Sequence, residues 1–462
     1  MTTMAIAPRP RARARRTLLA AAVLAGGTFL ASQLAAPTAP TAPGISPSAP
    51  AVALPNVAAM PVPLDRVDAA IATWSANLER DGADFIAATH LAELYVARGR
   101  ITGLAADYAR ASDAVEQALR TEPDLLSARL VGAQGLLDAH DFAGAARAAS
   151  AILRDHPELP QALAMLGDAQ VEMGAYAAAE RTYARLSMAV DAPAVVARQA
   201  KLLATTGSLE VARQLADRAL RAARADPATA ATDVAWYHML AGTLALQAGD
   251  LRGAEASFAS SIELDPTSEP ARVALGRTLA AQGRDEAAMA AYERAIAIAP
   301  HPDSLGALAD LLLLSGRTEE AERRYAQADA LDAMDPEGSG LVSVDRAVIL
   351  YLADHGKRTR YAVRLAEADL AKRRDVRGWD VLAWALLADG QVERAEAAMR
   401  RARAQGTQDP LLDYHAGMIA AAAGRPAEAA DLLRRALAVN PNFDPLQATR
   451  AREMLLRLAS AA

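Results

Sequence analysis

The feature that most constrains this chain is a glycine that returns at nearly constant spacing. Intervals of 33, 42, 34, 33, 40, 34 and 34 residues separate the successive members of the series Gly174, Gly207, Gly249, Gly283, Gly316, Gly356, Gly390 and Gly424. Between these glycines lie paired helical patterns and nothing that reads as a strand. A period near 34 residues with two helices per unit is typical of a helical solenoid, in which each unit packs only on its neighbours. The sequence therefore predicts an all-α fold that is suited to binding rather than to catalysis.

The clearest unit spans residues 161–187. Apolar residues mark one face of a first helix that includes Gly167, and Gly174 then supplies the backbone freedom that a tight helix–helix turn needs. Ala179 and Tyr183 face inward from a second helix. The stretch LGDAQVEMGAYAAAERTYARL resembles the tetratricopeptide repeat, because it carries that family's leucine-glycine pair, turn glycine, two aromatic residues and alanine in register. The resemblance implies a right-handed α-solenoid.

Three packing positions recur around each turn. Seven residues before it, where the second helix crosses the first, we expect a small residue: Gly167, Gly242, Gly276, Gly417, Ala92, Ala133, Ala200, Ala309 or Ala383, with Ile349 as the exception. Five residues after it stand Ala145, Ala179, Ala212, Ala254, Ala288, Ala321, Ala395 and Ala429, with Tyr361 as the exception. Nine residues after it, a bulky residue fills the gap between units: Tyr183, Phe258, Tyr292, Tyr325, Leu365, Met399 or Leu433.

This register predicts about ten helix pairs between residues 84 and 440, followed by a capping helix at 445–460 that covers the last apolar face. His140 replaces the turn glycine of the second unit. Gly99 is taken as the turn glycine of the first, which implies an extended second helix or a loop near 101–107. Longer connections at 224–234 and 333–341 divide the array into blocks 64–225, 226–334 and 340–462.

The first 36 residues have the pattern of an export signal. Arg9, Arg11, Arg13, Arg15 and Arg16 precede an apolar stretch over 17–36, which is about as long as a membrane-crossing helix must be. A cleaved signal peptide and a retained signal anchor both remain open. Because positive charge stays in the cytoplasm, we expect the rest of the chain to be exported to the periplasm or the extracellular space. Residues 37–63 contain eight prolines and are expected to form an extended linker.

The charge balance argues against nucleic acid. The whole chain has 49 basic and 55 acidic residues, and without the five N-terminal arginines the net charge is −11. A protein with this net negative charge repels the phosphate backbone of a nucleic acid. The chain has no cysteine, and its seven histidines are dispersed, so neither a thiolate nor a zinc site is indicated. There is no phosphate-binding glycine loop and no nucleophile elbow. We therefore expect neither an enzyme nor a cofactor.

In tetratricopeptide proteins the first helices line the concave face, where ligands usually bind. In the present register that face carries Glu93, Gln134, Asp168, Lys201, Thr243, Arg277 and Asp310 in the first seven of its ten positions. The positions near the C-terminal end are apolar and comprise Leu350, Trp384 and Met418, with Leu387 and Tyr414 beside them. We interpret these five residues as a docking groove for a peptide or a partner helix. The alternative is that Trp384 and Met418 only fill the gap between neighbouring units.

One basic run stands out from the acidic background. It consists of Lys357, Arg358, Arg360, Arg364, Lys372, Arg373, Arg374 and Arg377. A functional interpretation is contact with an anionic envelope polymer or with lipid head groups. The alternative is a solvated second helix with arginines near its C-terminal end, where the helix dipole favours them. Taken together, the sequence predicts a non-catalytic scaffold of the cell envelope that binds other proteins, with membrane association through residues 17–36.

Overall fold

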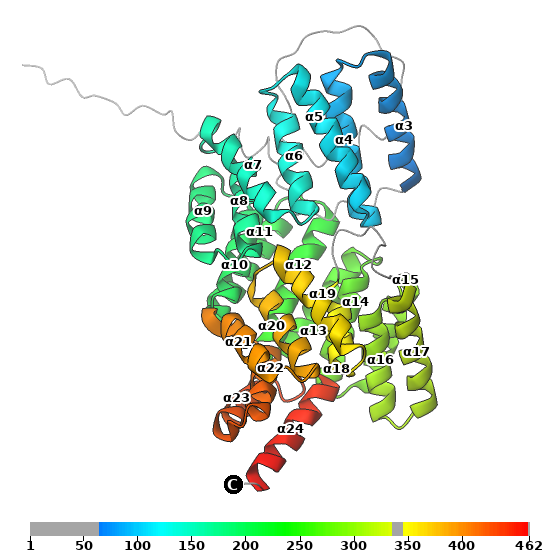
Figure 1. Cartoon of the computed structure of the whole chain (residues 1–462), viewed down its shortest axis with the longest axis vertical. Helices are drawn as coiled ribbons and strands as arrows, with labels where there is room; N and C mark the ends of the chain where they lie inside the picture. Colours follow the sequence, from blue (N-terminus) through cyan, green and yellow to red (C-terminus); the bar gives the residue numbers. More distant parts are fainter. Residues whose placement is uncertain (1–63, 335–344, 461–462) are drawn as a thin grey trace, which may run out of the picture.

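The computed structural model describes residues 64–334 and 345–460, whose regular elements are helices (Figure 1). Over these residues, ten helix pairs follow α3 (Leu64–Arg80) and precede α24 (Pro445–Ser460). The pairs are α4 (Phe85–Thr102) with α5 (Ala105–Thr121), α6 (Leu126–Asp138) with α7 (Phe142–Asp155), α8 (Pro160–Glu172) with α9 (Tyr176–Ala189), α10 (Pro193–Thr205) with α11 (Leu209–Ala225), α12 (Ala231–Gln247) with α13 (Leu251–Leu264), α14 (Glu269–Ala281) with α15 (Asp285–Ile298), α16 (Pro302–Leu314) with α17 (Thr318–Met334), α18 (Arg346–Asp354) with α19 (Thr359–Lys372), α20 (Val376–Ala388) with α21 (Val392–Ala402), and α22 (Pro410–Ala422) with α23 (Pro426–Val439). The predicted all-α solenoid of about ten pairs is confirmed.

The turn inside each pair requires a left-handed backbone. All eight glycines of the series have φ between +61° and +86°, which L side chains adopt only with strain. His140 takes the same conformation in the second pair, with φ of +57°. Side chains that cap the following helix assist several turns, as when the Asp250 carboxylate accepts a hydrogen bond from Gly253 N at 3.0 Å. The spacing of the glycines therefore follows from this backbone requirement.

The small residues let the two helices of a pair approach closely. A Cβ placed on Gly242 would lie 2.6 Å from the ring of Phe258, and one on Gly276 would lie 2.8 Å from the ring of Tyr292. Both rings are almost completely buried. The alanines five residues after the turns have no exposed surface, as predicted. In the pairs with a glycine at the crossing, one bulky residue thus occupies the space that a missing side chain leaves open.

Two positions of the predicted register are wrong. Gly99 is not a turn residue: it lies inside α4, and the left-handed residue that ends this helix is Gly103, with φ of +71°. Gly99 is required for another reason, because a Cβ there would lie 2.7 Å from the ring of Tyr108. The first pair therefore has a longer first helix, and the second helix begins at Ala105.

The second correction concerns the pair that begins with Ile349. In this pair, two residues lie between Gly356 and the start of the second helix, and the last of them is Arg358. In the other glycine turns, only one residue separates the glycine from the second helix. The inserted residue shifts the register, so Ala362 and Ala366 are buried in place of Tyr361 and Leu365. The bulky Ile349, which has no exposed surface, then belongs to the same core as these two alanines. In this pair the first helix contributes a large side chain and the second helix contributes small ones. This exchange of sizes explains why Ile349 and Tyr361 both depart from the pattern.

The array winds far enough for its later pairs to pack on its earlier ones (Figure 1). We call the side formed by the turns within pairs the turn edge, and the side formed by the connections between pairs the connection edge. The connection edge of the last pairs lies on the turn edge of the α8 to α14 region. Arg374 N donates to Glu172 O at 2.8 Å, and Val376 N donates to the Tyr176 hydroxyl at 2.8 Å.

The same contact continues along the edge. Gln408 Nε2 donates to Gly207 O at 3.1 Å, and Asn442 Nδ2 donates to Ala281 O at 3.2 Å. These partners are 201 and 161 residues apart in the chain. The donors bond backbone carbonyls at or near the ends of first helices, which the helix itself leaves without partners. The stacking therefore satisfies groups that a straight solenoid would expose to water.

The division of the array into three blocks stays a prediction. α11 packs on α12 across the connection at 226–230, so the first two blocks stack continuously. The third block packs on both of the others through the edge contacts. The predicted signal segment and linker (1–63) and most of the 333–341 connection lie outside the described residues. Over the described ranges, no helix combines the length and the apolar character that a membrane crossing requires.

Candidate functional site

The polar positions predicted to line the concave face mostly bind their neighbours. Asp168 accepts hydrogen bonds from Arg198 Nε at 2.9 Å and from the Tyr183 hydroxyl at 2.7 Å. The Arg277 guanidinium lies 2.6 Å from Asp303. Lys201 and Thr243 are exposed. This ladder of seven positions is therefore mixed. Asp168, Arg277 and Asp310 bond to other helices. Glu93, Gln134 and Thr243 bond within their own helices.

Asp310, the last polar position of this ladder, belongs to a network that joins three helices. Its carboxylate accepts from the Tyr325 hydroxyl at 2.5 Å and from His355 Nε2 at 2.9 Å. Burial alone would lower the pKa of His355, but Asp310 and the Tyr351 carbonyl oxygen raise it above its ordinary value. The network links α16, α17 and α18, and it holds the α18 pair against the preceding one.

The five apolar groove residues do come together in space. Leu350, Trp384, Leu387, Tyr414 and Met418 belong to one core cluster, as the sequence pattern predicted. The structure also shows what covers them: Ala451, Met454, Leu455 and Leu458 of α24 pack in the same cluster. Tyr414 has no exposed surface, and only 6% of Trp384 is exposed. The groove is therefore occupied by a helix of the chain itself.

Polar contacts fix α24 in this position. Asp354, at the end of α18, accepts hydrogen bonds from Trp384 Nε1 at 2.7 Å and from Gln447 Nε2 at 2.6 Å. Arg450 donates to the backbone carbonyl of Asp354 at 2.8 Å. α24 thus lies against the first helices α16, α18 and α22 as well as against α23. The predicted capping helix is present, and it lies along the concave side.

The position of α24 also affects the titration of the Asp354 carboxyl. The residue as a whole is partly exposed, but its carboxyl group is surrounded by protein. This burial, together with the negative charge of nearby Asp444, raises the pKa of Asp354 to about 7. The folded chain therefore binds this proton more tightly than the unfolded chain does, since the ordinary value is 3.8. The stability that the proton contributes is present at acid pH and is lost as the pH rises through about 7.

We expect Asp354→Asn to weaken the pH dependence of stability. Asparagine keeps an oxygen that can accept from Trp384 but does not ionise, so the variant should lose less stability than the wild type between about pH 5 and pH 8. Thermal unfolding of both proteins across this range measures the difference. Burial would lower the pKa of His415, but Asp380 raises it, so some pH dependence of the same sign should remain. Parallel curves for the two proteins would contradict the assignment.

The basic run is distributed over different environments. Lys357 pairs with Asp329 at 2.8 Å, and Arg373 pairs with Asp369 at 2.5 Å. Arg358 and Arg364 lie over the Tyr361 ring, at 4.1 and 5.3 Å from its centroid. The other members are exposed, namely Arg360, Lys372, Arg374 and Arg377.

The run also covers a long stretch of the molecule, because α19 alone is about 20 Å long at 1.5 Å per residue. At least two of its charges, Lys357 and Arg373, are compensated by carboxylates. No specific observation therefore favours an anionic polymer site over the solvated-helix interpretation. Whether the run contacts anions stays a prediction. Among the described residues, no group of three or more histidine, aspartate or glutamate side chains could hold a metal ion.

Comparisons with known proteins agree with this geometry. A model of the tetratricopeptide repeat family matches residues 136–202 and 245–303, and a second model of the family matches residues 381–445. The chain is a tetratricopeptide repeat protein. The matched segments lie in the early, middle and late pairs, so tetratricopeptide repeats occur in all three parts of the array. No curated protein matches this tetratricopeptide chain in sequence.

Several solved structures are similar to the tetratricopeptide array. "MamA MSR-1 C2" is 20% identical with a TM-score of 0.31, over 36% of this chain and 93% of that one. PilW, described as a type IV pilus biogenesis factor, is 18% identical with a TM-score of 0.41, over 46% and 94%. The human IFIT1 dimer with PPP-AAAA is 17% identical with a TM-score of 0.44, over 68% and 73%. Such identities concern the fold alone.

Sequence reasoning missed the residues that α24 brings to the groove. Gln447 and Arg450 reach Asp354 from 93 and 96 residues away. No local pattern could indicate these contacts, because the repeat period describes only neighbouring tetratricopeptide units. The apolar stripe of α24 was a usable signal, and it was interpreted as a cap on the last pair.

Proposed function

We propose that this tetratricopeptide protein is a non-catalytic scaffold that binds an amphipathic helix of a partner protein on the concave face of its last four pairs. Tetratricopeptide proteins typically bind other proteins or peptides. The observation that carries the finer proposal is that α24, an amphipathic helix, already lies in this place and contacts Trp384, Tyr414 and Asp354. A partner helix would use the same i, i+3, i+4, i+7 spacing of apolar residues.

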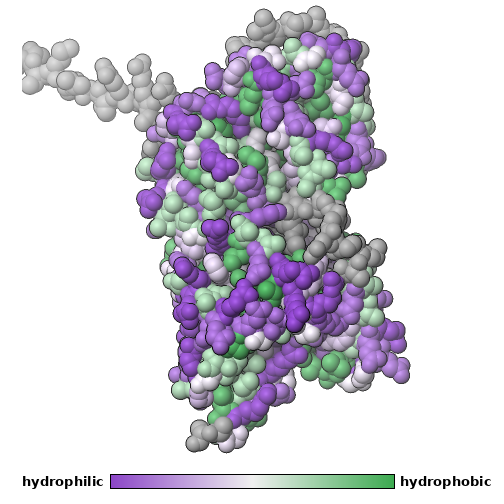
Figure 2. Space-filling view, viewed as in Figure 1, coloured by the Kyte–Doolittle hydropathy of each residue, from purple (hydrophilic) through white to green (hydrophobic). Residues whose placement is uncertain are grey.

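The fit of α24 is incomplete, which favours exchange with a partner. His415 Nε2 and Gln447 Oε1 are buried and have no hydrogen-bond partner among the described residues. Buried polar atoms without partners cost free energy. A helix that supplied these bonds could compete with α24 even though the tethered helix has the advantage of a high effective concentration. Elsewhere on the face seen in Figure 2, apolar residues are scattered among hydrophilic ones.

We further propose that the scaffold acts in the cell envelope. The support is the arginine-rich segment followed by the apolar stretch 17–36, which has the order of an export signal. The net charge of −11 outside that segment supports proteins rather than nucleic acid as partners. Fusion of residues 1–63 to a reporter that is active only outside the cytoplasm tests the location. An inactive reporter, produced at normal levels, would contradict it.

The groove can be tested with the chain's own helix as the probe. In the double variant Leu455→Glu, Leu458→Glu, two charges enter the apolar seat, so we expect α24 to leave the groove. A fluorescent synthetic peptide of residues 444–460 should then bind this variant, and fluorescence anisotropy should detect at least about tenfold tighter binding than to the wild type. Leu456→Glu is the matched control, because 72% of Leu456 is exposed and its charge should not move α24.

Two outcomes would contradict the groove. One is equal binding of the peptide to the wild type, the control and the double variant. The other is no binding to the double variant while circular dichroism shows that its helices are intact. Either would mean that the concave face does not accept a helix in trans.

A further inference from the structure

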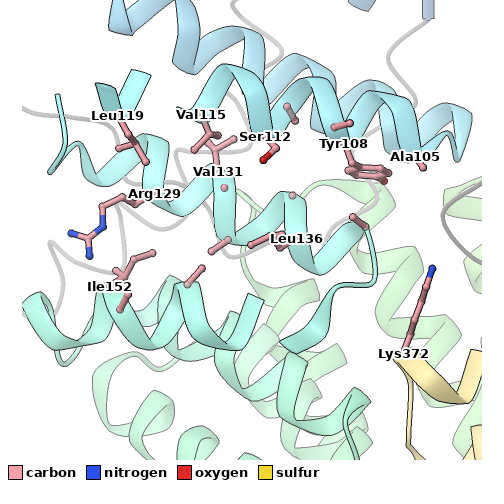
Figure 3. Close-up of a pocket in the computed structure, with 18 residues that line it drawn as sticks. Ala105, Tyr108, Ser112, Val115, Leu119, Arg129, Val131, Leu136, Ile152 and Lys372 are labelled. Carbon is pink, nitrogen blue, oxygen red and sulfur yellow. The ribbon is translucent and has the colours of Figure 1, made fainter. Parts of the chain in front are cut away.

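A second cleft lies far from the α24 seat, between α5 and α7 (Figure 3). Its volume is about 540 Å³, and its floor is α6. Ala105, Ala109 and Ser112, spaced four and three residues apart, form the α5 wall and are exposed. Ala148 and Ala151 line the α7 side, and Val131 lies on the floor. Small side chains on both walls leave the space between the helices open.

The composition of the cleft is that of a ligand site rather than of a packing defect. Most of the residues that line the cleft are apolar. Ser112 and Tyr108, which each carry a hydroxyl group, are among the few polar ones. Sites for small ligands usually have volumes of about 300–1,000 Å³ and combine an apolar lining with a few placed polar groups. The volume and the lining both fall within this description.

The charged side chains that line the cleft are both cationic. Arg129 lies at one end, where it also pairs with Asp155 at 2.8 Å, and Lys372 extends toward the cleft from the end of α19 (Figure 3). Lys372 reaches this place because the later pairs stack on the earlier ones. The cation at this end of the cleft is therefore supplied only in the wound array. Its charge complements an anionic ligand.

A smaller polar pocket of about 360 Å³ shares Tyr108 with the cleft. It contains Arg100, His140 and Arg373, together with the acids Asp138 and Glu172. His140 holds the strained turn conformation for which the other turns use glycine. Its Nδ1 is buried, and no described residue forms a hydrogen bond with it. Strained residues that a sequence retains often belong to functional sites. The pocket offers hydrogen-bonding groups next to the apolar cleft.

The shape of the cleft decides between two kinds of anionic occupant. An extended peptide would bury its backbone N–H and C=O groups against helices whose own backbone groups are already paired, and that burial is costly. A hydrocarbon chain has no polar groups to satisfy and fits a narrow apolar cleft.

We propose that the cleft between α5 and α7 binds an anionic amphiphile, with its apolar chain over α6 and its carboxylate or phosphate head at Lys372. This site goes beyond the proposed helix-binding function, because it shares no residue with the concave groove. A lipid-like ligand in the cleft would lie where the later helix pairs stack on the earlier ones.

The test uses the full chain and the fluorescent fatty acid cis-parinaric acid as probe. We expect saturable binding that laurate and dodecyl phosphate displace, and these two competitors distinguish a carboxylate from a phosphate head. Dodecanol and dodecyltrimethylammonium, which lack the negative charge, should compete at least about tenfold less well.

Two variants locate the site. Ser112→Trp fills the cleft from an exposed position and should weaken probe binding at least about tenfold. Lys372→Glu should weaken it by a similar factor, about tenfold, whereas Lys372→Arg should keep the affinity. Arg377→Glu is the matched control, because Arg377 belongs to the same basic run but does not line the cleft. Leu455→Glu, Leu458→Glu, which tests the groove, should leave probe binding unchanged, so the two proposals can fail separately.

Several results would overturn the proposal. These are the absence of saturable binding to the full chain, unchanged affinity in a folded Ser112→Trp variant, or equal losses for Lys372→Glu and Arg377→Glu. Displacement of the probe by an acidic amphipathic peptide but not by laurate or dodecyl phosphate would assign the cleft to a protein partner instead. Lys372 is exposed, so its variants report on binding even if Ser112→Trp fails to fold.

Discussion

Replacement of Arg346 by leucine is expected to lower the free energy of unfolding by about 3–5 kcal/mol, one of the two largest effects that we expect from a single substitution. Arg346 donates from Nε to Asp369 at 2.7 Å and from Nη2 to Asp375 at 2.6 Å. Its side chain is 14% exposed, and those of Asp369 and Asp375 are 2% and 16% exposed. The variant would leave the buried carboxylates without this shared partner. Chemical unfolding followed by circular dichroism measures the loss.

The effect should extend beyond α18. Asp375 caps α20 by accepting from Gly378 N, and the same connection donates from Arg374 and Val376 to the α8–α9 turn. Loss of Arg346 should therefore also loosen the stacking of the two parts of the array. Hydrogen exchange at the amides of Arg374 and Val376 should become faster in the variant.

Arg394→Leu is the matched control for this experiment. Arg394 pairs with Glu367 at 2.6 Å, but the two side chains are 55% and 45% exposed. Exposed pairs of this kind contribute about 0–1 kcal/mol. If the two variants lose equal stability, burial does not determine the contribution of the Arg346 pairs, and the expectation fails.

The second large effect is expected for Gly249→Ala. Alanine in the left-handed conformation costs about 1–2 kcal/mol, and Gly249 has φ of +77°. A Cβ there would also overlap the carbonyl oxygen of Val439, at the connection edge that stacks on this turn. Forced displacement of well-packed groups typically costs a further 1–3 kcal/mol or so. We expect a total of about 2–5 kcal/mol in thermal or chemical unfolding.

Gly424→Ala separates the two contributions. Gly424 has nearly the same φ, +73°, but no atom lies within 4 Å of its Cβ position. Only the conformational cost of about 1–2 kcal/mol should appear there. Small-angle scattering should show an enlarged radius of gyration for Gly249→Ala and an unchanged one for Gly424→Ala. Identical stability losses with unchanged scattering in both variants would show that the stacked edge contributes nothing.

Much of the local fold could be predicted from the sequence because it follows from rules within one repeat. A glycine recurs where φ must be positive, and an alanine recurs where two helices cross, as at Gly174 and Ala179. The repeat rules place the first turn wrongly at Gly99, and they leave Tyr361 as an unexplained exception. Gly99 accommodates the Tyr108 ring instead of making a turn, and an inserted residue before α19 shifted the register by one.

The candidate sites were predicted less well, because they depend on contacts that no repeat rule describes. The apolar residues around Trp384 were correctly placed together, but the sequence did not indicate that α24 covers them. Lys372 was assigned to a charge run, although the structure places it at a cleft formed by α5, α6 and α7. Its distance from those helices in the chain, more than 200 residues, gave no signal.

The sequence by itself determined the helix pairs, their number and the residues that hold each pair together. Those features depend on backbone conformation and on side-chain size over about 34 residues, and both can be read along the chain. The tertiary structure alone decided that the later pairs stack on the earlier ones and that the last helix occupies the concave face. These contacts depend on the small rotation between successive pairs, which accumulates over the whole array and is encoded at no single position.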